Sequence, residues 1–109
     1  MKNLKTMYGT TDQIIETVSL SYGVNSIDVK GNRRFDELMT PRQVIMYFLK
    51  FYCKLKLRII ADILGKKDHT SIIHGIKQVE NRKQYDKVYE FYYNQAIKEV
   101  ESNFEHELY

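Results

Sequence analysis

A long apolar segment near the middle of the chain places the strongest limit on its fold. Residues 41–53 have the sequence PRQVIMYFLKFYC, with apolar side chains in nearly every direction around a helix. Such a pattern is typical of a helix that is buried on all sides. Thr40 followed by Pro41 has the form of an N-cap and a first helical residue, which predicts that the helix begins there. We therefore expect a domain packed around one central helix.

Amphipathic segments on both sides of this helix predict an all-α fold of about five helices. Thr10 and Gln13 form a capping-box pattern that opens a first helix, and Gly23 follows its end. A short helical turn and a basic, irregular link come next. Three further helices, of which the last is long and rich in tyrosine, are predicted from the helical spacing of apolar residues at 57–64, 68–82 and 85–104. One Pro and five Gly in the whole chain fit a fold with few turns.

The chain is predicted to be a single domain over residues 1–109, with a core at about 11–83 and an acidic C-terminal helix at about 84–104. A chain of 109 residues can bury a sufficient hydrophobic core without disulfides or a structural metal. The single Cys53 cannot form an internal disulfide, which favours a reducing, cytoplasmic setting. No apolar stretch is long enough to cross a membrane, and the N-terminus does not resemble a signal peptide.

The charge is distributed unevenly along the chain. Residues 30–83 hold 13 basic and 5 acidic side chains, a net +8, whereas the remainder holds 4 basic and 9 acidic ones, a net −5. A basic centre between acidic ends indicates a polyanionic partner at one surface. A solvated charged face explains the same composition equally well.

The segment GKKDHTSIIHG at residues 65–75 is the richest in chemically active side chains. A metal site is disfavoured because His69 and His74 are five residues apart, about 140° around a helix, whereas histidines that share a metal are three or four apart. A catalytic pair is also disfavoured, because Asp68 and His69 are sequence neighbours and no nucleophile motif accompanies them. We expect no metal, no cofactor and no catalytic residue.

The same segment fits the second helix of a helix-turn-helix. Ile72, Ile73, Ile76 and Val79 form one inward stripe, and the opposite side carries Thr70, His74, Lys77 and Asn81. Asp68 and His69 lie in the first turn, beyond the end of that stripe. A helix entering the major groove end-on presents this turn to base edges, and its free N–H groups favour phosphate. The plainer alternative is that Asp68 only caps the helix and His69 is a surface residue.

From Arg33 to Arg82 the chain resembles the C-terminal DNA-binding domain of the bacterial replication initiator DnaA. That family carries Arg-Asp-His-Thr-Thr-Val on its second helix-turn-helix helix, where this chain has KDHTSI at 67–72. The family's Pro-Arg-Gln at the start of its central helix is matched by residues 41–43, without a gap between the two blocks.

The resemblance implies an all-α helix-turn-helix domain that binds double-stranded DNA at boxes of the TTATNCACA type, as a nucleoid-associated protein. By position it assigns base contacts to Asp68, His69, Thr70 and Ser71, and a minor-groove contact to Arg34. The residues expected at phosphates, by family position or by their place beside the helix, are Arg42, Gln43, Lys50, Lys66, Lys67 and Lys77. Ser71 and Lys67 replace the family's Thr and Arg, and Gly75 replaces a small Ala and is expected to loosen the helix slightly.

Family initiators carry an ATPase module ahead of this domain, whereas the present sequence has no GxxxxGK[ST] loop. We therefore expect DNA binding without nucleotide binding or ATPase activity, as in replication control or in a phage or mobile-element regulator. The alternative is a protein-interaction module that kept the fold and uses its Tyr-rich acidic C-terminal helix on a protein partner. The initial Met favours a complete small protein, and an excised domain fits the same sequence.

Overall fold

The computed structural model describes residues 3–31 and 35–108, with side chains described as far as residue 103. Over these residues the chain forms six helices and one small antiparallel hairpin. In chain order the elements are β1 (Lys5–Thr6), β2 (Gly9–Thr10), α1 (Thr11–Ser21), α2 (Ser26–Lys30), α3 (Asp36–Phe51), α4 (Leu57–Ile63), α5 (Thr70–Tyr85) and α6 (Lys87–Leu108). The predicted all-α class is confirmed.

Helix α1 begins as its sequence predicts. The Gln13 main-chain N–H donates to the Thr10 hydroxyl at 3.2 Å, and the Thr10 N–H donates to the Gln13 side-chain oxygen at 2.8 Å. These two bonds complete a capping box, which satisfies donors that a helix start otherwise leaves unpaired. Gly23 follows the helix with a φ of +71°, the left-handed conformation that glycine adopts without steric cost.

Helix α3 begins one turn earlier than predicted, at Asp36 and not at Pro41. Pro41 has no N–H to donate to the carbonyl of Glu37, so the prediction placed it at the helix start. Burial of Leu38, which is 2% exposed, favours the added turn. The acids Asp36 and Glu37 also lie in that first turn, where the helix dipole favours negative charge.

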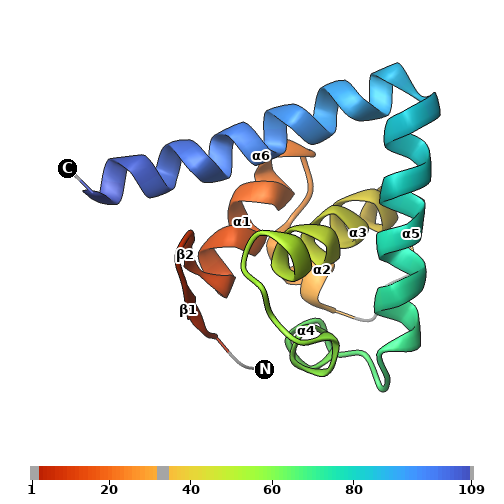
Figure 1. The fold of residues 1–109 in the computed structure, drawn as a ribbon, viewed down its shortest axis with the longest axis horizontal. Helices are drawn as coiled ribbons and strands as arrows, with labels where there is room; N and C mark the ends of the chain where they lie inside the picture. Colours follow the sequence, from red (N-terminus) through yellow and green to blue (C-terminus); the bar gives the residue numbers. More distant parts are fainter. Residues whose placement is uncertain (1–2, 32–34, 109) are drawn as a thin grey trace.

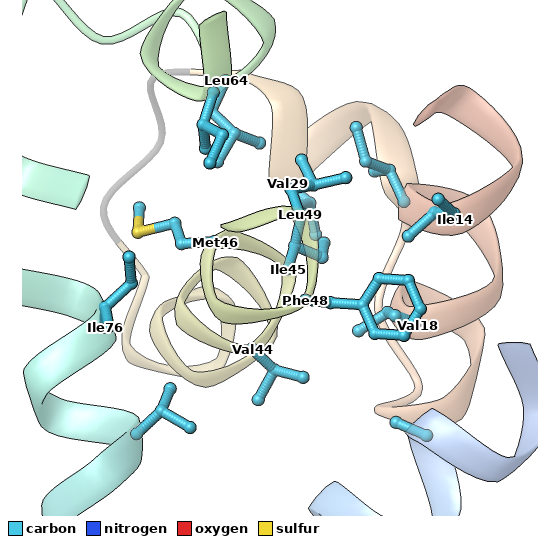
Figure 2. Close-up of a cluster of buried hydrophobic side chains, with 14 of the residues drawn as sticks. Ile14, Val18, Val29, Val44, Ile45, Met46, Phe48, Leu49, Leu64 and Ile76 are labelled. Carbon is cyan, nitrogen blue, oxygen red and sulfur yellow. The ribbon is translucent and has the colours of Figure 1, made fainter. Parts of the chain in front are cut away.

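Helix α3 lies at the centre of the molecule, as predicted from its apolar sequence. Val44, Ile45, Phe48 and Leu49 are fully buried, and Figure 2 shows their side chains directed toward the surrounding helices. The partners come from every other helix, so that one continuous core results. Met46 lies between α3 and α5, on the side of the core that faces Ile76 (Figure 2).

The C-terminal helix α6 packs across α1 and the end of α5 (Figure 1). Its inward face buries Tyr93, Ala96 and Val100, and Asn103 donates to the Thr17 hydroxyl of α1 at 3.0 Å. Asp86 separates α5 from α6 and accepts the Tyr89 N–H at 3.0 Å, and the core continues past it into α6. The long helix predicted at 84–104 is therefore present, with its start shifted by three residues.

The N-terminal hairpin was missed by the sequence analysis. It is only two residues long on each strand and ends directly at α1. Leu4 is tied to Thr11 through both of its main-chain groups, at 3.0 and 2.8 Å. Tyr8, in the turn, packs edge-on against Phe48 at 5.2 Å and Tyr52 at 6.0 Å between ring centroids. A long-range aromatic contact of this kind leaves no periodic signal in a seven-residue segment.

Candidate nucleic-acid interface

Helices α4 and α5 are joined by a tight turn at Gly65. The Gly65 φ is +67°, and the Lys66 N–H donates to the Ala61 carbonyl at 2.8 Å, which closes the end of α4. Ile60, Ile63 and Leu64 are buried on one side of the joint and Ile72 on the other. The short turn and shared apolar seam hold the two helices at a fixed angle, which is the arrangement of a helix-turn-helix.

Four exposed residues precede Ile72, the first buried residue of α5; two of them lie just before the helix, which begins at Thr70, and two open it. Asp68, His69, Thr70 and Ser71 are all exposed, whereas Ile72 is fully buried. The Asp68 carboxylate accepts the Thr70 N–H at 2.9 Å, so one of its oxygens caps the helix. The cap fixes the carboxylate at the end of the helix without covering it. The structure thus brings the four predicted base-contacting residues together at one exposed tip.

The outward face of α5 is close to the predicted one. His74, Lys77 and Asn81 are exposed, as the helical spacing indicates. The inward stripe differs from the prediction at one residue: Ile73 is 36% exposed, and Gly75 is buried instead. The stripe therefore consists of Ile72, Gly75, Ile76 and Val79.

Gly75 allows α5 to approach α3 closely. A Cβ atom added at this position would lie 2.5 Å from the Met46 sulfur and 3.4 Å from Cγ of Gln43. The expectation that Gly75 only loosens the helix is therefore incomplete, because its missing side chain also leaves room for the Met46 sulfur, which would have to shift if a Cβ were present. The sequence analysis did not infer this contact, although a lone glycine inside an otherwise amphipathic helix is a signal for a close approach.

A depression of about 480 Å³ lies between α3 and α5, next to the exposed tip. Three of the predicted phosphate contacts, Arg42, Gln43 and Lys66, line it together with Ser71 and His74. Gln43 is largely buried and Lys66 is half-buried. Lys67 and Lys77 are exposed, and Lys50 is half-buried in the last turn of α3.

Arg42, also predicted as a phosphate contact, packs against the end of α2. Its side chain is 8% exposed, and its guanidinium donates to the carbonyls of Val29 at 2.9 Å, Asp28 at 2.8 Å and Gly31 at 3.0 Å. Burial lowers the pKa of Arg42, and the nearby Asp28 carboxylate partly opposes that shift. From these three bonds we infer that Arg42 holds the C-terminal end of α2 and is not a phosphate contact.

The predicted minor-groove residue Arg34 lies outside the described residues, as does Arg33. The described chain before them ends at Gly31, whose carbonyl Arg42 holds. The Arg34 contact therefore stays a prediction.

The described residues contain neither a candidate metal site nor a helix that could cross a membrane. No group of three or more His, Cys, Asp or Glu side chains with metal-binding geometry occurs there. None of the helices in the described part of the chain combines the length and apolar character needed to cross a membrane.

Burial raises the pKa of the Cys53 thiol, and the Thr6 side chain opposes that shift through a hydrogen bond.

The joint at Gly65 and the exposed tip of α5 define a helix-turn-helix domain. Residues 11–79 match the family model described as the bacterial dnaA protein helix-turn-helix. The chain is 38% identical over 72 residues to the chromosomal replication initiator protein DnaA of Wolbachia pipientis wMel, covering 66% of this chain and 16% of that protein. It is 36% identical over 77 residues to the DnaA protein of Rickettsia canadensis, covering 71% of this chain and 17% of that protein.

Two solved structures resemble the fold. One is titled as a crystal structure of a DNA replication initiation factor, with a TM-score of 0.68 and 30% identity over 83% of this chain and 29% of that one. The other, replication initiator DnaA bound to AMPPCP and single-stranded DNA, gives a TM-score of 0.66 at 30% identity, over 83% of this chain and 28% of that one. The chain belongs to the DnaA helix-turn-helix family, and it spans about a sixth of the length of the curated relatives that it matches.

Proposed function

We propose that the chain binds double-stranded DNA sequence-specifically, at DnaA-box-like sites, through the first turn of α5. The observation that carries the proposal is the exposure of Asp68 to Ser71 at a capped helix start, just before Ile72, the first buried residue of α5. A carboxylate accepts from the cytosine amino group, and a threonine methyl packs against the thymine methyl. The positive end of the helix dipole at the same place favours a phosphate.

Charge around the tip supports a backbone contact on either side of the base-contacting turn. Lys67 precedes it and Lys77 follows it on the outward face of α5, and both are exposed. Lys66 and Gln43 line the depression beside it. Phosphate contacts of this kind position a protein on the duplex, whereas the base contacts specify the sequence. Lys50 is also proposed as a phosphate contact, on the basis of its position in the family.

The proposed activity of these 109 residues is binding alone, with no step that requires a nucleotide. Occupying boxes, competing for them or recruiting a partner to them would serve replication control or the regulation of a phage or mobile element. We expect ATP to change neither the melting temperature nor the affinity for DNA. A shift of either on adding ATP would contradict this part of the proposal.

The testing experiment is a salt-titrated binding assay with a box-containing duplex and a scrambled duplex of the same composition. Specific recognition predicts tighter binding to the box at every salt concentration. Lys50→Ala should weaken binding to both duplexes alike and reduce the salt slope by about one unit. Equal affinity for box and scrambled DNA in the wild-type protein would refute sequence-specific recognition.

A second candidate function is protein binding through α6. Val88, Phe91 and Tyr92 are 66%, 63% and 49% exposed on the first turns of this helix, and Tyr85 just before it is 83% exposed. Large apolar side chains gathered on one surface are typical of interaction sites. The same assay separates the two functions, because a module that lost specific DNA binding gives no preference for the box.

A further inference from the structure

The segment that joins α3 to α4 carries a row of basic side chains on its outer side. Over residues 54–58 burial alternates strictly, with Leu55 and Leu57 half-buried and Lys54, Lys56 and Arg58 exposed. The two leucines anchor the segment, and the Leu55 N–H donates to the Leu49 carbonyl at 3.0 Å. No acidic residue occurs in the sequence between Glu37 and Asp62. The three cations are thus held outward, and the nearest acidic residue in the sequence is Asp62, four residues after Arg58.

Lys54 occupies an unfavourable backbone conformation. Its φ of +61° is the one positive φ found at a non-glycine residue in the described part of the chain. A side chain with a Cβ disfavours this conformation, and glycine would adopt it freely. None of the three cations forms an ion pair with another described residue. A charged residue kept at a strained position without an internal partner is a reason to look for an external one.

The strip lies at the end of the molecule that presents α5. Figure 1 shows α4 and the N-terminal end of α5 side by side at one end, with α6 at the opposite end. In a helix-turn-helix complex the first helix crosses the DNA backbone while the second helix enters the major groove. Helix α4 is that first helix here, and Lys56 and Arg58 lie at its start.

We propose that Lys54, Lys56 and Arg58 form a phosphate-binding strip on the DNA backbone that borders the groove occupied by α5. The proposal rests on the proposed function, since it takes the orientation of the duplex from it. The strip adds affinity without sequence preference, because ammonium and guanidinium groups bind phosphate oxygens whatever the base. Arg58 can bind its phosphate through two parallel hydrogen bonds, whereas the lysines act as point charges.

The first experiment compares two double variants that each remove two exposed positive charges. Lys56→Ala with Arg58→Ala changes the strip, and Lys87→Ala with Lys98→Ala changes α6 at the opposite end of the molecule. We expect the strip variant to reduce the salt slope of DNA binding by about 1.8 units, since each phosphate contact contributes about 0.9. The affinity for box and scrambled duplexes should fall by the same factor, and the control variant should keep the wild-type slope. Equal slope changes in the two variants would overturn the strip.

The second experiment uses Lys54→Gly, which separates charge from backbone strain. Glycine accepts the left-handed φ, so the urea midpoint of unfolding should hold or rise while the salt slope falls by about 0.9 units. A purely structural lysine would leave the slope at its wild-type value, and that result would overturn its place in the strip. The salt slope of DNA binding tests the strip, whereas the preference for the box over the scrambled duplex tests the proposed function. A wild-type protein that binds both duplexes equally therefore refutes only the latter, and one that binds no DNA refutes both.

Discussion

The Nε atom of Arg42 donates a hydrogen bond of 2.9 Å to the main-chain carbonyl of Val29, thirteen residues earlier in the chain. Two further bonds join the same guanidinium to Asp28 and Gly31, so one side chain of α3 holds the whole C-terminal end of α2. The next described residue after Gly31 is Phe35, which precedes α3. Arg42 thus fixes the position of Gly31.

Arg42→Ala is expected to act on stability. Three carbonyls lose a charged donor, so the free energy of unfolding should fall by about 2 to 4 kcal/mol. Arg42→Lys should recover little of it, because an ammonium lacks the planar fork that reaches several acceptors. Urea unfolding measures the loss, and a salt titration of DNA binding should give the wild-type slope. A variant of normal stability whose slope drops by one unit would return Arg42 to the phosphate contacts.

Asp68 is expected to contribute to both helix capping and base contact, and two substitutions separate these effects. Asp68→Ala removes the oxygen that accepts the Thr70 N–H, which should cost about 1 kcal/mol of stability together with the preference for the box. Asp68→Asn keeps an oxygen at that position, so stability should stay near wild type while discrimination falls by about 1–3 kcal/mol.

His69→Ala provides the comparison for Asp68, because the His69 side chain makes no capping bond. We expect it to lose box preference by about 1–3 kcal/mol while its stability and weak general binding remain. Paired titrations on box and scrambled duplexes measure both quantities. Should the Asp68 and His69 variants weaken binding to both duplexes equally, the base-contact assignment fails.

Gly75→Val is expected to destabilise the contact between α5 and α3. Its Cβ would lie 2.5 Å from the Met46 sulfur, so the free energy of unfolding should fall by about 1–3 kcal/mol through overpacking. Combining it with Met46→Val removes the clashing atom, and the double variant should lose less than the sum of the single losses. Additive losses in urea unfolding would show that the two residues do not compete for the same space.

Arg34→Ala is expected to change sequence preference in the A/T-rich half of the box. A guanidinium in a narrow minor groove responds to groove width and negative potential, which are greatest in A/T-rich DNA. Duplexes that vary only that half should show lost affinity and lost A/T preference, while discrimination in the half contacted by Asp68 and His69 remains. An unchanged A/T preference would make Arg34 an ordinary surface charge.

Alkaline pH is expected to destabilise the protein through its buried tyrosines. Burial raises the pKa of Tyr89 to about 12; Arg82 lowers this pKa and Asp86 raises it. Burial also raises the pKa of Tyr22 and of Tyr93. The unfolded hydroxyl ionises near pH 10, so this contribution is complete below pH 10 and is lost as the pH rises toward 12.

Tyr89→Phe provides the control for the alkaline effect. The Tyr89 hydroxyl is buried without a hydrogen-bond partner among the described residues, so the substitution should not lower stability at pH 8. Between pH 10 and 12 the free energy of unfolding of the variant should fall less steeply than that of the wild type. Parallel curves from urea unfolding would contradict the assignment to Tyr89.

The sequence by itself determined the features that depend on neighbouring residues. Thr10 and Gln13 cap α1 as predicted, and Gly65 follows the end of α4 with a positive φ. The exposed tip of α5 followed from the same logic, since helical spacing places Ile72 inward and leaves Asp68 and His69 beyond the stripe. Capping and periodicity act within a few residues, so the chain specifies them without knowledge of its tertiary partners.

Only the tertiary structure decided which polar groups are available at the surface. Arg42 has the position of a phosphate contact, yet the unpaired carbonyls at the end of α2 lie beside it and take its donors. Gly75 is a weak helix residue by propensity, and its value becomes visible only where Met46 closes on it. Each outcome depends on a partner that is distant along the chain, because burial and hydrogen bonding are properties of the packed neighbours and not of the local sequence.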